Sequence, residues 1–110
     1  MTHKIATKSV YALTRGAWTA RWADWVVELR HLPTGWRSTV WHWPVGTRGR
    51  RLGQASCFQV PLLAASWAAT ILGRVGARVM VDGQPRALID CLAFTPAPVL
   101  EVQTDGSVPS

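Results

Sequence analysis

Residues 36–51 read WRSTVWHWPVGTRGRR. Within residues 35–45, two sets of side chains alternate with the period of two that is typical of a β-strand. One set is Trp36, Ser38, Val40 and His42, and the other is Arg37, Thr39, Trp41, Trp43 and Val45. Because both sets contain tryptophan, we predict a central strand with one face on the core. Pro44 and Gly46 end it, and residues 46–56, with three glycines and three arginines, are predicted to form an exposed loop.

The segment before this strand, residues 17–32, carries its large apolar side chains at the spacing of one helical face. These side chains are Trp18, Trp22, Trp25, Val26, Leu29 and Leu32. We therefore predict a helix, ended by Pro33 and Gly35. An alternative stays open, because residues 25–32 are rich in types that favour strands and the PTG sequence at 33–35 suits a hairpin turn. In that alternative a strand replaces the first helix, giving a barrel-like sheet with a single helix.

The segment after the loop supplies a second predicted helix. Residues 58–73 combine large apolar side chains with alanines on all sides, so this helix is predicted to be buried. Ser56 is a candidate N-cap, and Pro61 is acceptable in the first turn because a proline there lacks only an amide that the helix does not need. We assign Trp67 to the core, together with Trp22 and Trp25.

Shorter elements are predicted near both ends of the chain. Residues 4–13 alternate loosely and indicate a strand. Residues 77–94 indicate two strands joined at residues 82–83, an Asp-Gly pair that suits a tight turn. A short edge strand is predicted at 99–102, and a frayed tail at 103–110.

These elements predict an α+β fold, with a small, mainly antiparallel sheet and two helices packed on one face. The chain has 110 residues, of which 48% are hydrophobic and 16% charged, so we predict one globular domain over residues 1–102. The formal net charge is +6, and the basic residues concentrate in residues 1–51. Charge asymmetry of this kind indicates an anionic partner.

Several classes of protein are excluded by the same sequence. The first fifteen residues lack the apolar region of a signal peptide, so a cytoplasmic protein is predicted. The longest apolar run, residues 60–73, is shorter than the roughly twenty residues that span a bilayer, so no membrane role is expected. The histidines and cysteines are too scattered for a zinc motif, and no residue pattern predicts catalysis. We expect neither a metal nor another cofactor, and no enzymatic activity.

The central stretch supplies the candidate binding site. Aromatic rings next to fixed positive charge suit a phosphate-bearing polymer with exposed bases. Arginine forks onto phosphate, and tryptophan stacks on unpaired bases. The candidate residues are Trp36, Arg37, Trp41, Trp43, Arg48, Arg50 and Arg51. The leading hypothesis is therefore a small nucleic-acid-binding protein with little sequence specificity.

Two other hypotheses fit the same stretch. A protein-binding regulator or inhibitor would dock the arginines on an acidic protein surface, as in a small phage or mobile-element protein that blocks a host defence complex. A subunit of an oligomer would place the tryptophans in a homodimer interface. The same residues would also fit a sheet packed on a core with a solvated basic turn.

Overall fold

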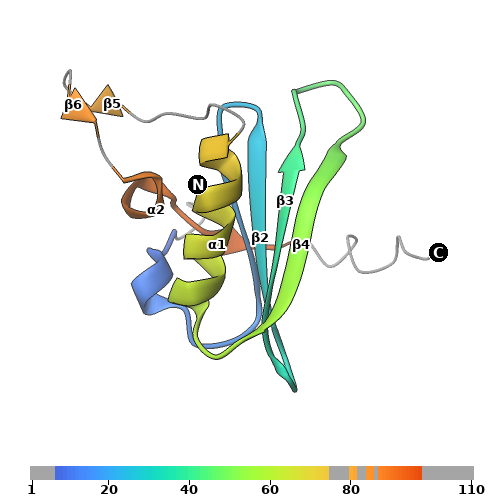
Figure 1. Cartoon of the computed structure of the whole chain (residues 1–110), viewed down its shortest axis with the longest axis vertical. Helices are drawn as coiled ribbons and strands as arrows, with labels where there is room; N and C mark the ends of the chain where they lie inside the picture. Colours follow the sequence, from blue (N-terminus) through green and yellow to red (C-terminus); the bar gives the residue numbers. More distant parts are fainter. Residues whose placement is uncertain (1–6, 75–79, 82–83, 86, 98–110) are drawn as a thin grey trace, which may run out of the picture.

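The computed structural model describes residues 7–74, 80–81, 84–85 and 87–97, and it has an α+β fold (Figure 1). A five-stranded antiparallel sheet has the order β4-β3-β2-β1-β7, and the helix α1 packs on one of its faces. The main elements are β1 (Ala17–Trp22), β2 (Trp25–Leu32), β3 (Gly35–His42), β4 (Arg50–Phe58), α1 (Pro61–Arg74) and β7 (Thr95–Pro96). The predicted fold class is confirmed.

The helix predicted over residues 17–32 is wrong, because this segment is a hairpin of β1 and β2. Its strands pair from Ala17↔Arg30 to Trp22↔Trp25, and Ala23 turns the chain with a φ of 53°. A two-residue turn places Trp22 opposite Trp25, and Trp18 lies opposite Leu29. These four residues therefore lie on one face of the sheet, and the same spacing would place them on one face of a helix. The alternative with a strand in place of the first helix was nearer the structure.

The predicted central strand is confirmed as β3, with β2 and β4 on its two sides. Gly35 follows the β2–β3 turn with a φ of 130°, and a Cβ there would lie 2.7 Å from the carbonyl oxygen of Phe58, so a side chain does not fit. The loop predicted over 46–56 is wrong beyond Gly49, since β4 begins at Arg50. Pairing with β3 gives those residues a strand partner that their composition does not indicate.

The predicted second helix is confirmed as α1, which begins at Pro61. Ser56 is not its cap, because Ser56 lies within β4. Four small or apolar residues of α1 are fully buried on the sheet: Ala64, Ala65, Ala68 and Leu72. Gly53 of β4 lets Trp67 approach closely, since a Cβ there would meet its ring at 3.2 Å. No helix in the described part of the chain is long and apolar enough to cross a membrane.

The core lies between α1 and one face of the sheet. The buried strand residues on this face are Ala20, Val27, Leu29, Trp36, Ser38 and Val40. Trp22, Trp25 and Trp67 are half-buried and pack against this core from its edge, so their predicted assignment to the core is confirmed only in part. Register explains the grouping, because Val27 pairs with Val40 and Val40 with Gly53.

The elements predicted near the two ends of the chain are confirmed only in part. The strand predicted at 4–13 is wrong in its described part, where Val10–Ala12 forms a 3-10 turn and Lys8 makes a single bridge to Phe94. In the predicted hairpin over 77–94, β5 (Met80–Val81) and β6 (Gln84–Pro85) do pair.

The second strand of that hairpin ends at Pro85, and Leu88–Cys91 forms the short helix α2 instead. β7 then pairs with the outer edge of β1, through Trp18↔Pro96. The turn at 82–83, the strand predicted at 99–102 and the tail at 103–110 lie outside the described residues.

Candidate nucleic-acid interface

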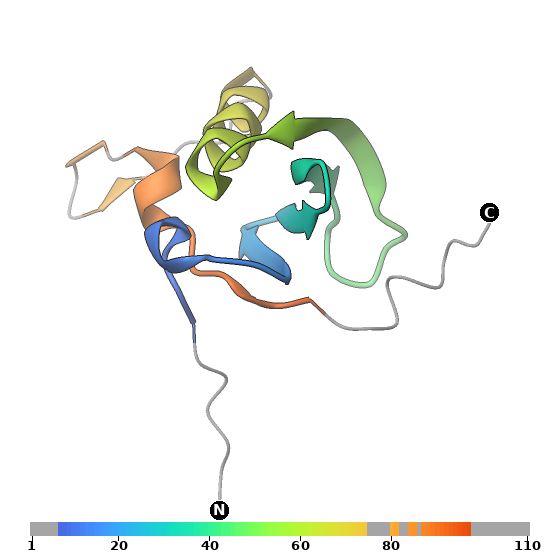
Figure 2. The same cartoon turned by 90° about the horizontal axis from the view of Figure 1, so that it is seen from below.

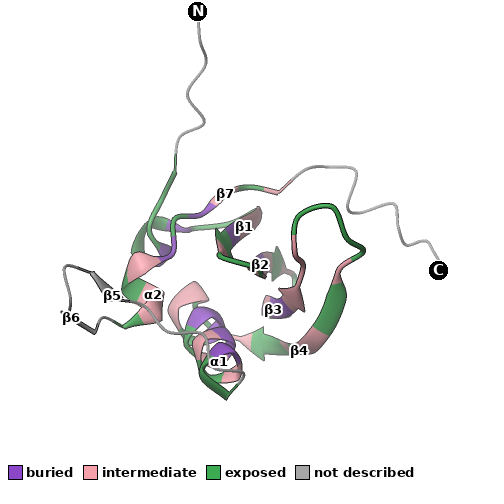
Figure 3. Cartoon of the chain, turned by 90° about the horizontal axis from the view of Figure 1, so that it is seen from above, coloured by how far each residue is buried: buried purple, intermediate pink, exposed green. Residues whose placement is uncertain are grey.

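The face of the sheet opposite α1, called the open face here, carries the candidate site. Strand register places eleven side chains on it: Ala17, Thr19, Arg21, Val26, Glu28, Arg30, Arg37, Thr39, Trp41, Arg51 and Gln54. Figure 2 shows β4 curving from α1 towards the β3–β4 connection. In Figure 3 that connection lies on the side of the sheet away from α1. The open face and the β3–β4 connection therefore lie on the same side of the sheet.

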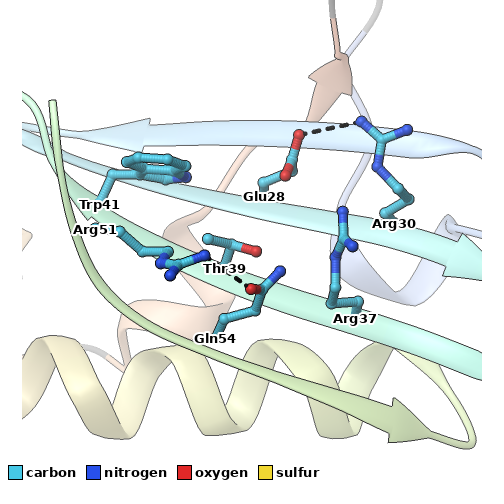
Figure 4. Close-up of a pocket in the computed structure, with 7 residues that line it drawn as sticks. All are labelled: Glu28, Arg30, Arg37, Thr39, Trp41, Arg51 and Gln54. Atoms are coloured by element: carbon cyan, nitrogen blue, oxygen red, sulfur yellow. Dashed lines mark hydrogen bonds and ion pairs between the residues drawn. The ribbon is translucent and has the colours of Figure 1, made fainter. Parts of the chain in front are cut away.

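Cross-strand pairing arranges these side chains in three rows. The tryptophan row is Arg21, Val26, Trp41 and Arg51; the polar row is Thr19, Glu28, Thr39 and Gln54; the arginine row is Ala17, Arg30 and Arg37. Successive rows are two residues apart along the strands, which corresponds to about 6.7 Å. Figure 4 shows Trp41 and Arg51 at one end, Glu28, Thr39 and Gln54 in the middle, and Arg30 and Arg37 at the other end.

The arginine row is electrostatically unfavourable within the described structure. Arg30 and Arg37 face each other directly across β2 and β3, and like charges in that position destabilise a sheet. Glu28 offsets part of this with one ion pair, 3.4 Å from Arg30 Nη2 to Glu28 Oε2. The Nε atoms of Arg30 and Arg37 are buried without a hydrogen-bond partner among the described residues. An anionic acceptor between the two guanidinium groups would satisfy both defects.

The tryptophan row joins an aromatic ring to an arginine. Trp41 is half-buried and lies directly across from Arg51, whose Nη1 donates to Gln54 Oε1 at 3.0 Å. The rings of Trp41 and Trp43 have centroids 5.7 Å apart at 50°. The pair thus forms an angled aromatic surface at one end of the open face.

Trp43 begins the β3–β4 connection and is held by contacts with that connection and with Arg21 of β1. Its Nε1 donates to the Thr47 carbonyl oxygen at 2.9 Å, and its carbonyl oxygen accepts from Arg21 Nη1 at 2.8 Å. Its ring also lies so close to Gly49 that a Cβ there would be 2.5 Å away. These contacts fix Trp43 as a wall beside Trp41.

The rows surround an open hollow of about 420 Å³. Its lining residues are Glu28, Arg30, Arg37, Thr39, Trp41, Arg51 and Gln54. Thr39 is only 2% exposed and forms the floor of the hollow. The volume falls in the range of small-ligand sites, roughly 300–1,000 Å³. A group of nucleotide size can therefore enter.

The structure brings together only part of the predicted site. Arg37, Trp41 and Arg51 line the hollow, and Trp43 stands beside it. Trp36 is 3% exposed and packs on the α1 side, so its predicted role as an exposed stacking ring is wrong.

The three arginines of the predicted loop do not act as one cluster. Arg48 is exposed in the β3–β4 connection. Arg50 pairs with His42 and Arg51 with Trp41, so strand alternation turns these neighbours to opposite faces. Arg50 lines a separate small hollow with Trp25, His42 and Leu52. Only Arg51 belongs to the open face.

Four lining residues were not predicted as site residues: Glu28, Arg30, Thr39 and Gln54. Glu28 and Arg30 were hidden by the wrong helix prediction. Their alternation with Val27 and Leu29 is the signal that would have placed them on one face of a strand. Gln54 was assigned to the loop, and without a strand at β4 its position opposite Thr39 has no signal in the sequence.

Among the described residues, no three His, Cys, Asp or Glu side chains gather closely enough to hold a metal ion. No family model, curated protein or solved structure matches the chain. Functional inference therefore depends on the geometry of the open face.

Proposed function

We propose that this protein binds single-stranded nucleic acid on the open face, with little sequence specificity. The observation that carries the proposal is the hollow itself, where a half-buried Trp41 ring, Arg51 and the opposed Arg30–Arg37 pair line one surface. Guanidinium groups bind phosphate oxygens, and aromatic rings stack on bases of any type. Both interactions are available within a single nucleotide-sized hollow.

The position of Trp41 favours unpaired bases. Its ring is half-buried in the hollow, with Trp43 beside it. Bases in a duplex are stacked on one another and cannot reach such a ring, whereas single-stranded bases can be splayed onto it. Single strands are therefore the expected ligand.

The other two hypotheses explain less of this surface. An acidic protein surface would attract the arginines but would leave the recessed Trp41 ring without a partner. A homodimer formed through the open face would bring two sets of arginines together, and like charges oppose that contact. Nucleic acid uses both the positive charge and the ring.

Fluorescence anisotropy of a labelled single-stranded oligonucleotide tests the proposal, measured at several salt concentrations. Arg51→Gln should weaken binding and reduce the slope of log K against log salt by about 0.7, the value for one phosphate contact on a single strand. Arg50→Gln is the matched control, since it removes the same charge from the adjacent residue on the opposite face. It should leave the slope nearly unchanged.

Trp41→Ala tests the stacking contribution in the same assay. Loss of one base–ring stack should cost about 1–3 kcal/mol of binding free energy, while the salt slope stays constant because no charge is removed. Equal losses for Arg50→Gln and Arg51→Gln would contradict binding on the open face. Absence of binding by the wild-type protein at low salt would overturn the proposal.

A further inference from the structure

The hollow is not uniformly basic, because an acidic residue of the polar row lines it. Glu28 places a carboxylate between Trp41 and the Arg30–Arg37 pair. A negative charge there weakens the attraction of the surface for phosphate. The ion pair that offsets the Arg30–Arg37 repulsion uses Glu28 Oε2 and leaves Oε1 for a second kind of group on the ligand.

The three rows follow the order of the parts of a nucleotide. An aromatic ring lies at one end, polar acceptors lie in the middle, and two opposed guanidinium groups lie at the other end (Figure 4). The two end rows are four residues apart along the strands, or about 13 Å, and the arginine side chains extend into that gap. A base on Trp41 and a phosphate between Arg30 and Arg37 would leave the sugar over the polar row.

The atoms of the polar row determine which hydrogen-bonding group the sugar must carry. Arg30 donates to Glu28 Oε2, and no described residue donates to Glu28 Oε1. An ionised carboxylate only accepts hydrogen bonds. Thr39 is only 2% exposed, and Gln54 Oε1 already accepts from Arg51 Nη1. Glu28 Oε1 is therefore the lining acceptor of this row to which no described residue donates. The matching ligand group is a hydroxyl that donates.

We propose, resting on the proposed function, that Glu28 accepts a hydrogen bond from the ribose 2′-hydroxyl and that the open face prefers RNA to DNA. Deoxyribose lacks this donor, so with DNA the carboxylate makes no such hydrogen bond and only repels the nearby phosphates. Arg30 holds the Glu28 carboxylate in place through their ion pair. A hydrogen bond to a charged acceptor is strong enough to give a preference of about tenfold or more.

The experiment compares oligouridine with oligodeoxyuridine of the same length, which differ only at the 2′ position. Wild-type protein should bind the RNA about tenfold more tightly. Glu28→Gln should raise the affinity for DNA, because a negative charge is lost, and should bring the RNA/DNA ratio close to one. The 2′-O-methyl form of the RNA keeps the oxygen but loses the donor, and wild-type protein should bind it no better than DNA.

Asp24→Asn is the matched control, because it removes one negative charge from the exposed β1–β2 turn, outside the residues that line the hollow. It should leave the RNA/DNA ratio at the wild-type value. Equal affinity of wild-type protein for RNA and DNA, or an unchanged ratio in Glu28→Gln, would overturn the inference and leave the proposed function standing. Displacement of the RNA by uridine monophosphate at equal concentration would overturn RNA as the ligand. If neither polymer binds, the proposed function itself fails.

Discussion

The two faces of the sheet are formed by alternate residues of the same strands, and they differ in burial and in charge. The centre of the face on α1 is built from buried side chains, most of them apolar, among them Val27, Leu29 and Val40. By strand register, the open face carries four arginines, at positions 21, 30, 37 and 51, and the acidic residue Glu28. Stability is therefore concentrated on one face, while the other carries four arginines of which one, Arg30, has an ion-pair partner among the described residues.

Adjacent residues make this contrast testable. Leu29 is fully buried, whereas Glu28 lines the hollow. Trp36 is buried, whereas Arg37 lines the hollow. Since neighbouring positions share a backbone environment but not a face, paired substitutions separate folding from binding.

The largest effect is expected from Leu29→Ala. Removing a fully buried side chain from the packed face should lower the free energy of unfolding by about 2–5 kcal/mol. Val26→Ala, on the open face of the same strand, should cost about 1 kcal/mol or less. Urea denaturation of both variants measures the difference. Comparable losses for the two would show that both faces contribute equally to stability.

A smaller effect of opposite sign is expected from Arg37→Gln. This change removes the direct opposition of Arg30 and Arg37, so the free energy of unfolding should rise by about 0.2–1 kcal/mol. The binding assay should show weaker RNA affinity for the same variant. Arg74→Gln, which removes a favourable charge from the last turn of α1, should instead lower stability. Destabilisation by both substitutions would mean that the arginine row supports the fold.

The smallest effect is expected outside both faces, where Tyr11 Oη donates to Asp90 Oδ1 at 3.1 Å. This hydrogen bond and the charge of Asp90 raise the pKa of Tyr11 above 10.0. Its stabilising contribution is therefore complete below pH 10 and is lost as the pH rises through the raised value. Wild-type protein should exceed Tyr11→Phe in stability slightly at neutral pH and lose that advantage as the pH rises through the raised pKa of Tyr11. A wild-type advantage that persists at high pH would contradict this assignment.

The sequence was most informative where one periodicity dominates. Residues 35–45 alternate without any competing pattern, so β3 and the grouping of its side chains into two faces were predicted correctly, although the alternation did not indicate which face is buried. Residues 17–32 satisfy two patterns at once, because a strand pair with a two-residue turn reproduces helical spacing. The turn at Ala23 has no glycine to reveal it, although Ala23 adopts a positive φ. Local propensity could not separate these cases, and pairing of β1 with β2 decided the outcome.

The geometry of the candidate site was predictable only in the part that lies on β3. Arg37 and Trp41 follow from the alternation of that strand. Arg51 was predicted as a site residue but in an exposed loop, and Arg30 was not predicted; both line the hollow with Arg37 and Trp41 because of inter-strand register. Register depends on turn geometry and on the two irregularities between β3 and β4, and neither is encoded in a residue pattern that can be read alone.

The pairing of β7 with β1 has a consequence for how the protein is made. Strands β1 to β4 each neighbour the next in sequence, so they can assemble as successive hairpins while the chain leaves the ribosome. The outer edge of β1 receives its partner only after Pro96 has been synthesised. At the usual rates of translation this interval is on the order of seconds, during which an unpaired strand is presented to the nascent chain's surroundings. Chaperone contact during synthesis is expected to concentrate on that edge.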